Sequence, residues 1–287
     1  MTRTGFHLGL AEGYDKSLAY AAKCGIKTAQ IFTHSPRSFS FKELDHEALK
    51  KLNAGWKQYD IHPIYSHCNY LINLGSSDNR IFHGSLNTCK KELEYARAFG
   101  CDFFVLHVGK YKDTTLNIGM QQVAKALNKL KEDIRKHNVM ILLETVAGAG
   151  TEIGAKFEEL NDLLNLIDVD VLDMIGIAVD TCHIFAAGYD IRTKEGVDAT
   201  IKTMDSTFGV ARIRLIHVND SKGELGGHLD RHEHVGKGNI GAEGLKAFLS
   251  HPKIKDIPMI LETPVDEPTD QAADLEALNA LLGRSST

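Results

Sequence analysis

Short apolar runs alternate with longer segments of helical periodicity along most of the chain. Several of these runs are almost continuously apolar, as in FFVLHV, MILLET, IGIAVD and PMILET, and such runs are typical of strands buried on both faces of a parallel sheet. We predict eight strands, over residues 6–10, 28–33, 63–68, 103–108, 140–145, 175–180, 213–220 and 258–263.

The segments between these strands carry apolar residues at spacings of three and four, which is the pattern of an amphipathic helix. Val123, Leu127 and Leu130 lie on one such stripe. Asp45 and Asp270 stand at the start of the second and the last of these segments, where an aspartate caps the free N–H groups of a helix. We therefore predict eight helices in strict alternation with the strands.

Eight βα units in about 250 residues are the size and pattern of a (β/α)8 TIM barrel, an α/β fold. The competing doubly wound sheet carries a G-x-G-x-x-G turn after its first strand, and GLAEGY stands there instead. No stretch rich in proline, glycine and serine interrupts the pattern. We expect a single barrel domain over residues 1–287, with residues 283–287 as a flexible C-terminal tail.

The composition excludes several classes of protein. With 43% hydrophobic and 25% charged residues, the chain is neither disordered nor collagen-like. No apolar window is long enough for a transmembrane helix, and the first residues lack the apolar core of a secretion signal. Five cysteines without a C-x-x-C pair predict reduced thiols in a cytoplasmic protein. The net charge of −5 counts, by itself, against a polyanionic partner.

Six consecutive predicted strands end in side chains that bind metals. The chemistry of a TIM barrel lies at the C-terminal ends of its strands, and the third to eighth strands carry there His67, His107, Glu144, Asp180, His217 and Glu262. A single histidine on a strand is more often a core residue. Six ionisable groups in one buried ring would carry a prohibitive desolvation cost without a metal, so the pattern predicts a metal site.

Three further candidates, His183, Asp230 and His232, follow the sixth and seventh strands. The nine donors are too many for one zinc ion, which takes roughly four or five ligands, and they imply about three ions. Imidazole and carboxylate donors without thiolate favour Zn2+, with Mn2+ or Fe2+ as alternatives. Because clustered ions are typical of phosphoester hydrolysis, the residues alone predict a trinuclear, metal-dependent hydrolase that acts on phosphate.

Six segments carry a resemblance to a known family. They are HCNYLINL (67–74), LETVAGAG (143–150), IAVDTCHIFAAGYD (177–190), HVNDSK (217–222), DRHEHVGKGNIG (230–241) and LET (261–263). In these segments, and over residues 6–262, the chain resembles endonuclease IV, the zinc-dependent DNA repair enzyme that cleaves the backbone at abasic sites. The order of D-T-C-H before D-R-H-E-H is highly specific, and all nine ligands of that family match a candidate named above.

The resemblance implies how three Zn2+ ions are held. The first takes His67, His107 and Glu144, the second takes Glu144, Asp180, His217 and Glu262, and the third takes His183, Asp230 and His232. It also implies that a metal-bridging hydroxide attacks the phosphate 5′ to the abasic sugar, with Glu144 and Glu262 as catalytic residues. The products are a 3′-hydroxyl and a 5′-deoxyribose phosphate, and related enzymes also trim blocked 3′ ends.

The same resemblance assigns DNA contacts to loops at the mouth of the barrel. Arg37, Tyr70 and Leu71 match family residues that enter a bent duplex; tyrosine and leucine fill the space left by an extruded nucleotide, and arginine occupies the minor groove. Further contacts are expected from basic residues on loops of that face, Lys110, Lys222 and Arg231. The expected partner is damaged double-stranded DNA, bound by a monomer, with the charge of three divalent ions placed where a phosphate binds.

Two other functions remain open on these residues. A sugar isomerase or epimerase shares the barrel and a related metal set, here Glu144, Asp180, His217 and Glu262, but needs neither the third-metal trio nor a wedge. A non-catalytic protein that binds lesions or metals would carry the same ligands without turnover.

The chain departs from the family pattern at few positions. Cys68 and Asn69 stand where the family often has two small residues before the tyrosine. His228 and His234, near the third metal set, are either solvated loop residues or partners of the ligands.

Overall fold

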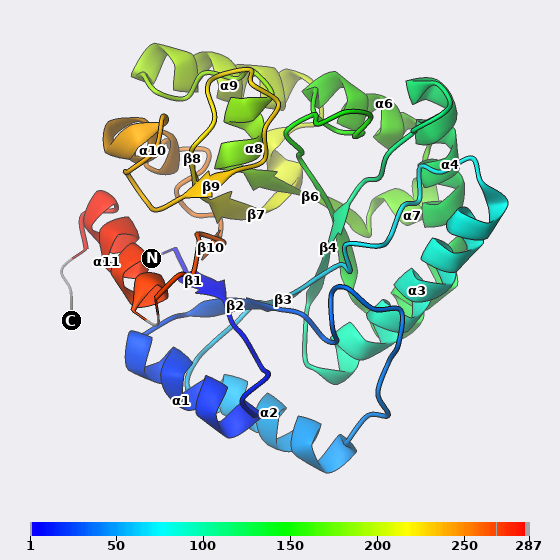
Figure 1. The fold of residues 1–287 in the computed structure, drawn as a ribbon, viewed down its shortest axis with the longest axis horizontal. Coiled ribbons are helices and arrows are strands. Elements are labelled where there is room, and N and C mark those ends of the chain that lie inside the picture. Colours follow the sequence, from blue (N-terminus) through cyan, green and yellow to red (C-terminus); the bar gives the residue numbers. More distant parts are fainter. Residues whose placement is uncertain (1, 268, 285–287) are drawn as a thin grey trace.

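Eight parallel strands close into a barrel in the order β1-β10-β7-β6-β5-β4-β3-β2 (Figure 1). The computed structural model describes residues 2–267 and 269–284. The barrel strands are β1 (Thr4–His7), β2 (Thr28–Ile31), β3 (Ile64–His67), β4 (Phe103–His107), β5 (Met140–Glu144), β6 (Ile175–Asp180), β7 (Ile213–Val218) and β10 (Met259–Leu261). Each strand pairs in parallel with both of its neighbours. The predicted α/β class and TIM barrel are confirmed.

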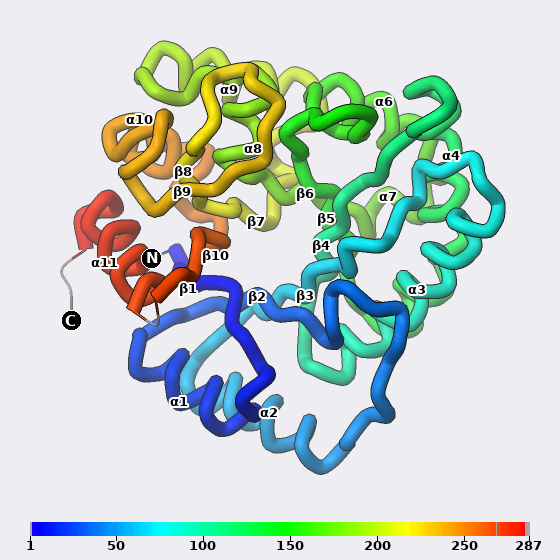
Figure 2. Tube along the Cα trace, in the orientation of Figure 1, coloured from blue at the N-terminus to red at the C-terminus, as the bar shows by residue number. Residues whose placement is uncertain are grey.

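Helices surround the strands (Figure 2). In the described part of the chain they are α1 (Tyr14–Cys24), α2 (His46–Gln58), α3 (Asn79–Ala98), α4 (Leu116–Lys129), α5 (Lys131–His137), α6 (Phe157–Leu166), α7 (Val169–Leu172), α8 (Thr181–Ala186), α9 (Lys194–Ser206), α10 (Gly241–Leu249) and α11 (Asp270–Leu281). The expected number of eight is wrong because three of the connections between strands hold two helices each. One of the added helices, α8, starts directly at the end of β6, where the Asp180 carboxylate accepts a hydrogen bond from His183 N at 2.9 Å.

The first strand begins and ends earlier than the sequence pattern predicts. β1 covers Thr4–His7 and pairs Gly5 with both Ile260 and Thr28. A Cβ atom on Gly5 would lie 1.8 Å from the Thr28 carbonyl oxygen, so only glycine permits this close approach of β1 and β2. The predicted strand over 6–10 is therefore displaced, and its true end is His7. The last strand is shorter than its predicted range of 258–263.

An apolar layer fills the interior of the barrel. It consists of one buried residue from each of six strands: Tyr65, Val105, Leu142, Ala178, Leu215 and Ile260. The Tyr65 hydroxyl donates to the Arg214 carbonyl at 2.9 Å. A second, larger core lies between the strands and the helices. This apolar layer closes the interior of the barrel. Polar side chains that face the barrel axis on the C-terminal side of the layer therefore lie at the mouth.

A small antiparallel pair of strands lies beside the mouth of the barrel. The predicted seventh strand over 213–220 is divided, because β7 ends at Val218 and β8 (Asp220–Ser221) pairs with β9 (His232–Glu233). The Asp220 carboxylate is buried and accepts hydrogen bonds from the backbone of Ser221, Ile240 and Gly241. This arrangement folds the intervening loop back and brings His232 to the barrel mouth.

The two predicted helix caps have different outcomes. Asp45 caps α2, and its side chain accepts a hydrogen bond from Ala48 N, as expected. The expected cap at Asp270 is wrong, since Asp270 is the first helical residue of α11 and its carboxylate accepts from the preceding backbone N–H groups of Asp266 and Glu267.

The end of the expected C-terminal tail, residues 285–287, lies outside the described residues. Arg284 is described, and its guanidinium donates to the Thr2 carbonyl at 2.8 Å. No helix among the described residues is long and apolar enough to cross a membrane.

Candidate metal centre

Six ligand candidates form a ring directly above the apolar layer. In each strand the candidate follows the interior residue by two positions, and because side chains alternate along a strand, both face the barrel axis. The pairs are Tyr65 and His67, Val105 and His107, Leu142 and Glu144, Ala178 and Asp180, Leu215 and His217, and Ile260 and Glu262. The pairing of the strands thus brings the six candidate donors, as the sequence pattern predicts, into one ring at the mouth of the barrel.

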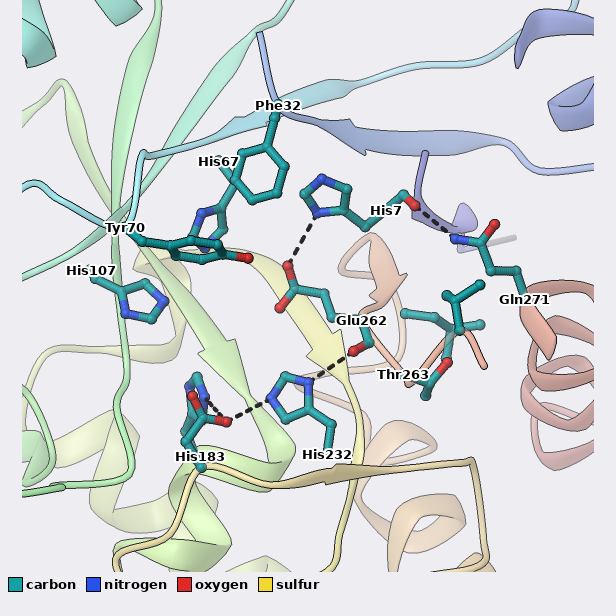
Figure 3. Close-up of a pocket in the computed structure, with 13 residues that line it drawn as sticks. His7, Phe32, His67, Tyr70, His107, His183, His232, Glu262, Thr263 and Gln271 are labelled. Carbon is teal, nitrogen blue, oxygen red and sulfur yellow. Dashed lines mark hydrogen bonds and ion pairs between the residues drawn. The ribbon is translucent and has the colours of Figure 1, made fainter. Parts of the chain in front are cut away.

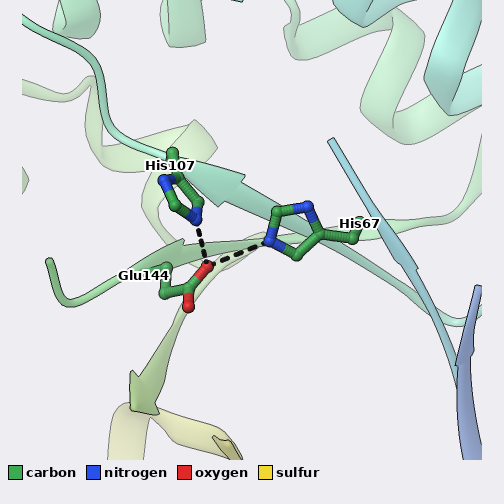
Figure 4. A group of neighbouring side chains, drawn as sticks. All are labelled: His67, His107 and Glu144. Carbon is green, nitrogen blue, oxygen red and sulfur yellow. Dashed lines mark hydrogen bonds and ion pairs between the residues drawn. The ribbon is translucent and has the colours of Figure 1, made fainter. Parts of the chain in front are cut away.

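Glu144 joins the first donor cluster (Figure 4). Its Oε2 atom lies 3.2 Å from His67 Nε2 and 3.1 Å from His107 Nε2. The ligand atoms of these three residues all lie within 4.8 Å of one another. Two imidazoles and one carboxylate at this spacing are a donor set suited to zinc.

The second cluster consists of Glu144, Asp180, His217 and Glu262. His217 Nδ1 lies 2.9 Å from Glu144 Oε1 and 3.3 Å from Glu262 Oε2, and 3.9 Å from Asp180 Oδ2. Glu144 therefore presents one oxygen to the first cluster and the other to the second. A carboxylate in this position can bridge two ions.

The third cluster combines His183 from α8, Asp230 from the loop after β8, and His232 from β9. Asp230 Oδ1 lies 3.2 Å from His183 Nε2 and 3.1 Å from His232 Nε2 (Figure 3). The Asp230 side chain is 47% exposed, whereas His183 is buried. This cluster is thus the one that depends on the loop folding back over the mouth.

Hydrogen bonds to the backbone orient the rings of three of these histidines. Their Nδ1 atoms lie close to carbonyl oxygens: His67 to Cys68 (2.9 Å), His183 to Thr145 (2.8 Å) and His232 to Glu262 (2.9 Å). A carbonyl only accepts, so Nδ1 carries a hydrogen, and in the neutral ring the lone pair that can bind a metal is on Nε2. The buried Nε2 atoms of His183 and His232 make no well-formed hydrogen bond, although each lies within 3.2 Å of the Asp230 carboxylate. A cation bound between the two imidazoles and this carboxylate would satisfy all three groups. The residues present fit a metal cluster.

His217 is oriented in the opposite sense by Gln30 on β2. His217 Nε2 lies 2.8 Å from Gln30 Oε1, so Nδ1 faces the second cluster. The Gln30 Nε2 atom donates to Glu262 Oε1, and Gln30 is fully buried. One amide therefore holds a histidine and a carboxylate of the same cluster.

Sequence reasoning missed Gln30 and His7, which occupy the ends of the first two strands. His7 Nδ1 lies 3.0 Å from Gln30 Nε2 and 3.6 Å from Glu262 Oε1. His7 was missed because the first strand is predicted over 6–10, which places its C-terminal end at residue 10 and not at His7. Gln30 was missed because the predicted metal ligands are histidine, aspartate and glutamate, and glutamine is not among them. With these two residues, all eight barrel strands present a polar side chain at the mouth.

The electrostatic balance keeps the carboxylates of the site ionised. Burial by itself would raise the pKa of Glu144, but the facing His107 and His217 hold that pKa well below its ordinary value. Burial is also the largest effect on Glu262 and would raise its pKa, but His217, His7 and His67 together lower that pKa. Burial would lower the pKa of His232, whereas Asp180 and Asp230 raise it to about 9. A metal must therefore displace protons from the histidines, not from the carboxylates.

The Cys182 sulfur also lies within 4.8 Å of the donor atoms of Asp180 and His232. Burial and the nearby Asp180 raise the pKa of Cys182 to about 12. The metal-binding form of cysteine is the thiolate, and a group with this pKa is a neutral thiol at pH 7. Imidazole and carboxylate therefore remain the candidate donors of the centre.

A cavity of about 310 Å³ opens over the three clusters (Figure 3). Phe32, Leu261 and Val265 line it beside the charged residues. Tyr70 and His107 line both this cavity and a larger groove of about 1070 Å³. The centre is therefore open to a substrate that extends along the neighbouring surface.

Tyr70 and Leu71, two of the residues expected to contact DNA, are 59% and 42% exposed. Arg37 is also exposed, and Tyr70 N donates to the Pro36 carbonyl at 3.0 Å, which joins the two loops. The remaining basic residues are exposed at the same face and have local partners: Lys110 pairs with Glu152 (3.1 Å), Lys222 lies 3.9 Å from Glu233, and Arg231 donates to the Asp230 carbonyl. Their contact with DNA stays a prediction.

The two histidines without an assigned role have separate partners. His234 Nδ1 lies 2.8 Å from Asp274 Oδ2 on α11, and Val235 N donates to the same carboxylate. These bonds attach the end of β9 to α11. His228 Nδ1 donates to the Ala147 carbonyl at 3.0 Å, which attaches the loop to the segment after β5.

Comparison with known proteins places this centre in a family. Residues 18–281 match the family model of the xylose isomerase-like TIM barrel. A protein of Halothermothrix orenii named probable endonuclease 4 is 37% identical over 279 residues, which cover 97% of this chain and 99% of that protein. The chain belongs to the endonuclease IV family.

Solved structures agree with membership of the endonuclease IV family. Endonuclease IV from Thermus thermophilus superimposes with a TM-score of 0.81 at 32% identity and covers 98% of this chain and 99% of its own. A D-tagatose 3-epimerase-like protein gives a TM-score of 0.75 at 20% identity, with 98% and 97% covered. The second likeness concerns the fold alone.

Proposed function

We propose that this chain is a DNA repair endonuclease that hydrolyses the phosphodiester 5′ to an abasic site in duplex DNA. The products would be a 3′-hydroxyl and a 5′-deoxyribose phosphate, and the same centre would remove blocking groups from 3′ ends. The observation that carries this function is the convergence of three donor clusters on one cavity beside the exposed Tyr70 and Leu71. The endonuclease names of full-length relatives add support.

Nine residues would hold three Zn2+ ions, with Mn2+ or Fe2+ as alternatives. They are His67, His107, Glu144, Asp180, His183, His217, Asp230, His232 and Glu262. When bound, such a cluster supplies a water of lowered pKa and a concentration of positive charge for phosphate.

The residues of the chain hold this centre in place and select its substrate. Glu144, fully buried, keeps the first two clusters at a fixed separation through its two oxygens. Glu262 lines the cavity with a side chain that is 16% exposed, so its ionised carboxylate can accept a hydrogen bond from a water in the cavity as well as bind a metal. We assign catalytic roles to Glu144 and Glu262 on these grounds.

The walls of the cavity favour a sugar without a base. Phe32 and Val265 offer apolar surface to a deoxyribose, while Tyr70 and Leu71 would fill the gap in the duplex that the extruded nucleotide leaves. Arg37 would occupy the minor groove, and further contacts to the backbone would come from Lys110, Lys222 and Arg231. The proposed state is a monomer that acts on damaged double-stranded DNA in the cytoplasm.

A nicking assay tests this function. The substrate is a labelled duplex with one abasic site, and the expected result is a single cut 5′ to the lesion without added Mg2+. Removal of metal by a chelator should abolish the cut, Zn2+ should restore it, and an intact duplex of the same sequence should stay uncut. Elemental analysis of the active protein should find three metal ions per chain.

The rival function is that of a sugar epimerase, whose fold is similar. The third cluster of His183, Asp230 and His232 favours the endonuclease, because an epimerase needs only one metal set. Turnover of a ketose together with no nicking of abasic duplex would replace the proposed function. Binding of abasic duplex without turnover in the metal-loaded protein would indicate a lesion-binding protein instead.

A further inference from the structure

We propose that Asn69 is a positioning residue that couples two loops at the barrel mouth and so determines how well abasic duplex is distinguished from intact duplex. The first loop, residues 32–45, connects β2 to α2 and carries Arg37; we call it the Arg37 loop. The second contributes Tyr70 and Leu71, which we call the wedge. This role rests on the proposed function, because it takes the wedge as the part that enters DNA.

Asn69 is buried, with 1% of its surface exposed, and each of its polar groups has a hydrogen-bond partner within the protein. Its side-chain oxygen accepts from Leu71 N at 2.6 Å, and its side-chain nitrogen donates to the Ser38 carbonyl at 2.5 Å. Its backbone carbonyl accepts from Ile72 N at 3.3 Å. One amide therefore binds the wedge on one side and the Arg37 loop on the other.

Glu92 on α3 accepts a hydrogen bond from the backbone N–H of Asn69 and so anchors the same residue through its main chain. Glu92 is 2% exposed, and its Oε1 lies 3.1 Å from Asn69 N and 3.5 Å from His34 Nε2. His34 belongs to the Arg37 loop and stacks on Phe41 of the same loop, with ring centroids 4.1 Å apart. The Arg37 loop and the wedge thus share one buried anchor on a long helix of the barrel.

This anchorage adds to the contacts of Tyr70, whose N–H donates to the Pro36 carbonyl and whose ring packs edge-on against Phe32 with centroids 5.5 Å apart. Tyr70 and Leu71 expose about half of their surface, so their direction follows the backbone that Asn69 fixes. A wedge ordered before binding avoids the entropy cost of ordering it in the complex. The benefit arises only when the wedge enters DNA, which happens at an abasic site and not in an intact duplex.

The decisive experiment compares three readouts in Asn69→Ala. They are kcat/KM for nicking a duplex with a tetrahydrofuran abasic analogue, the Kd for intact duplex, and the hydrolysis rate of bis(4-nitrophenyl) phosphate, a small diester. We expect the first to fall about tenfold, the size of a lost buried hydrogen bond, and the other two to change by less than about twofold, as for a substitution outside the centre. A parallel loss in diester hydrolysis would overturn the role.

A matched control and a double variant separate positioning from general destabilisation. Asn53 on α2 donates to the Ala98 carbonyl at 2.9 Å, away from the mouth, so Asn53→Ala should leave all three readouts unchanged. In a Tyr70→Ala, Leu71→Ala background, Asn69→Ala should have no further effect on nicking, because residues that act through one another are not additive. Additive losses would contradict coupling through the wedge.

Hydrogen exchange measured by mass spectrometry tests the coupling without DNA. Asn69→Asp keeps the acceptor for Leu71 N and removes the donor to Ser38, so it should speed exchange in residues 35–41 and leave 69–72 protected. Asn69→Ala should speed exchange in both segments. Unchanged exchange in both variants would refute the coupling. A wild-type protein that fails to nick abasic duplex would end the proposed function, whatever this measurement gives.

Discussion

Replacing Gln30 by leucine tests whether the second donor cluster is oriented from β2. The substitution nearly conserves volume and removes both the acceptor for His217 Nε2 and the donor to Glu262 Oε1. His217 and Gln30 are fully buried, so the imidazole N–H would be left unpaired at a cost of about 1–3 kcal/mol. Metal binding at this cluster should weaken as well, because the imidazole is then free to rotate and turn its Nδ1 away from Glu144.

We expect Gln30→Leu to weaken Zn2+ binding at this cluster about 10–100-fold, the usual effect of losing a partner that orients a ligand. Competition with a chromophoric chelator at constant pH measures the affinity. Thr28→Val is the matched control, since Thr28 is buried on the same strand and loses a hydrogen bond to the Pro63 carbonyl at the other end of the barrel. Wild-type affinity in Gln30→Leu, or an equal loss in Thr28→Val, would refute the reasoning.

Three further substitutions test other parts of the site. Glu262→Gln should abolish strand cleavage and leave binding of abasic duplex largely intact in a gel-shift assay; lost binding would mean that the residue mainly holds DNA. Tyr70→Ala should weaken binding to abasic duplex more than to intact duplex, and equal weakening would exclude the wedge role. Burial raises the pKa of Glu92 well above its ordinary value of 4.5, so the folded state binds the Glu92 proton more tightly than the unfolded state does. The folded state therefore loses stability as the pH rises above 4.5 toward the raised pKa. Glu92→Gln should therefore increase the free energy of unfolding more at about pH 8 than at about pH 5, as measured by urea denaturation; a pH-independent difference would contradict this.

The sequence pattern located the polar side chains at the C-terminal ends of β3 to β7 and β10 but missed those of β1 and β2. Near-continuous apolar runs identify buried strands, and the two-residue alternation then determines which side chains share the interior face with residues such as Leu142. β1 has no such run. Its position is decided by pairing with β2 and β10 and by the close approach at Gly5, which are contacts between distant parts of the chain.

The sequence by itself predicted the barrel and the nine candidate donors, because hydrophobic period and the residue types at strand ends are local properties. Only the tertiary structure decided which groups hold those donors. Gln30 reaches His217 across the closed barrel, β9 reaches the mouth by pairing with β8, and Asn69 meets Glu92 because α3 packs beneath its loop. Each of these contacts joins residues far apart along the chain, and barrel closure and loop docking, not local periodicity, bring them together.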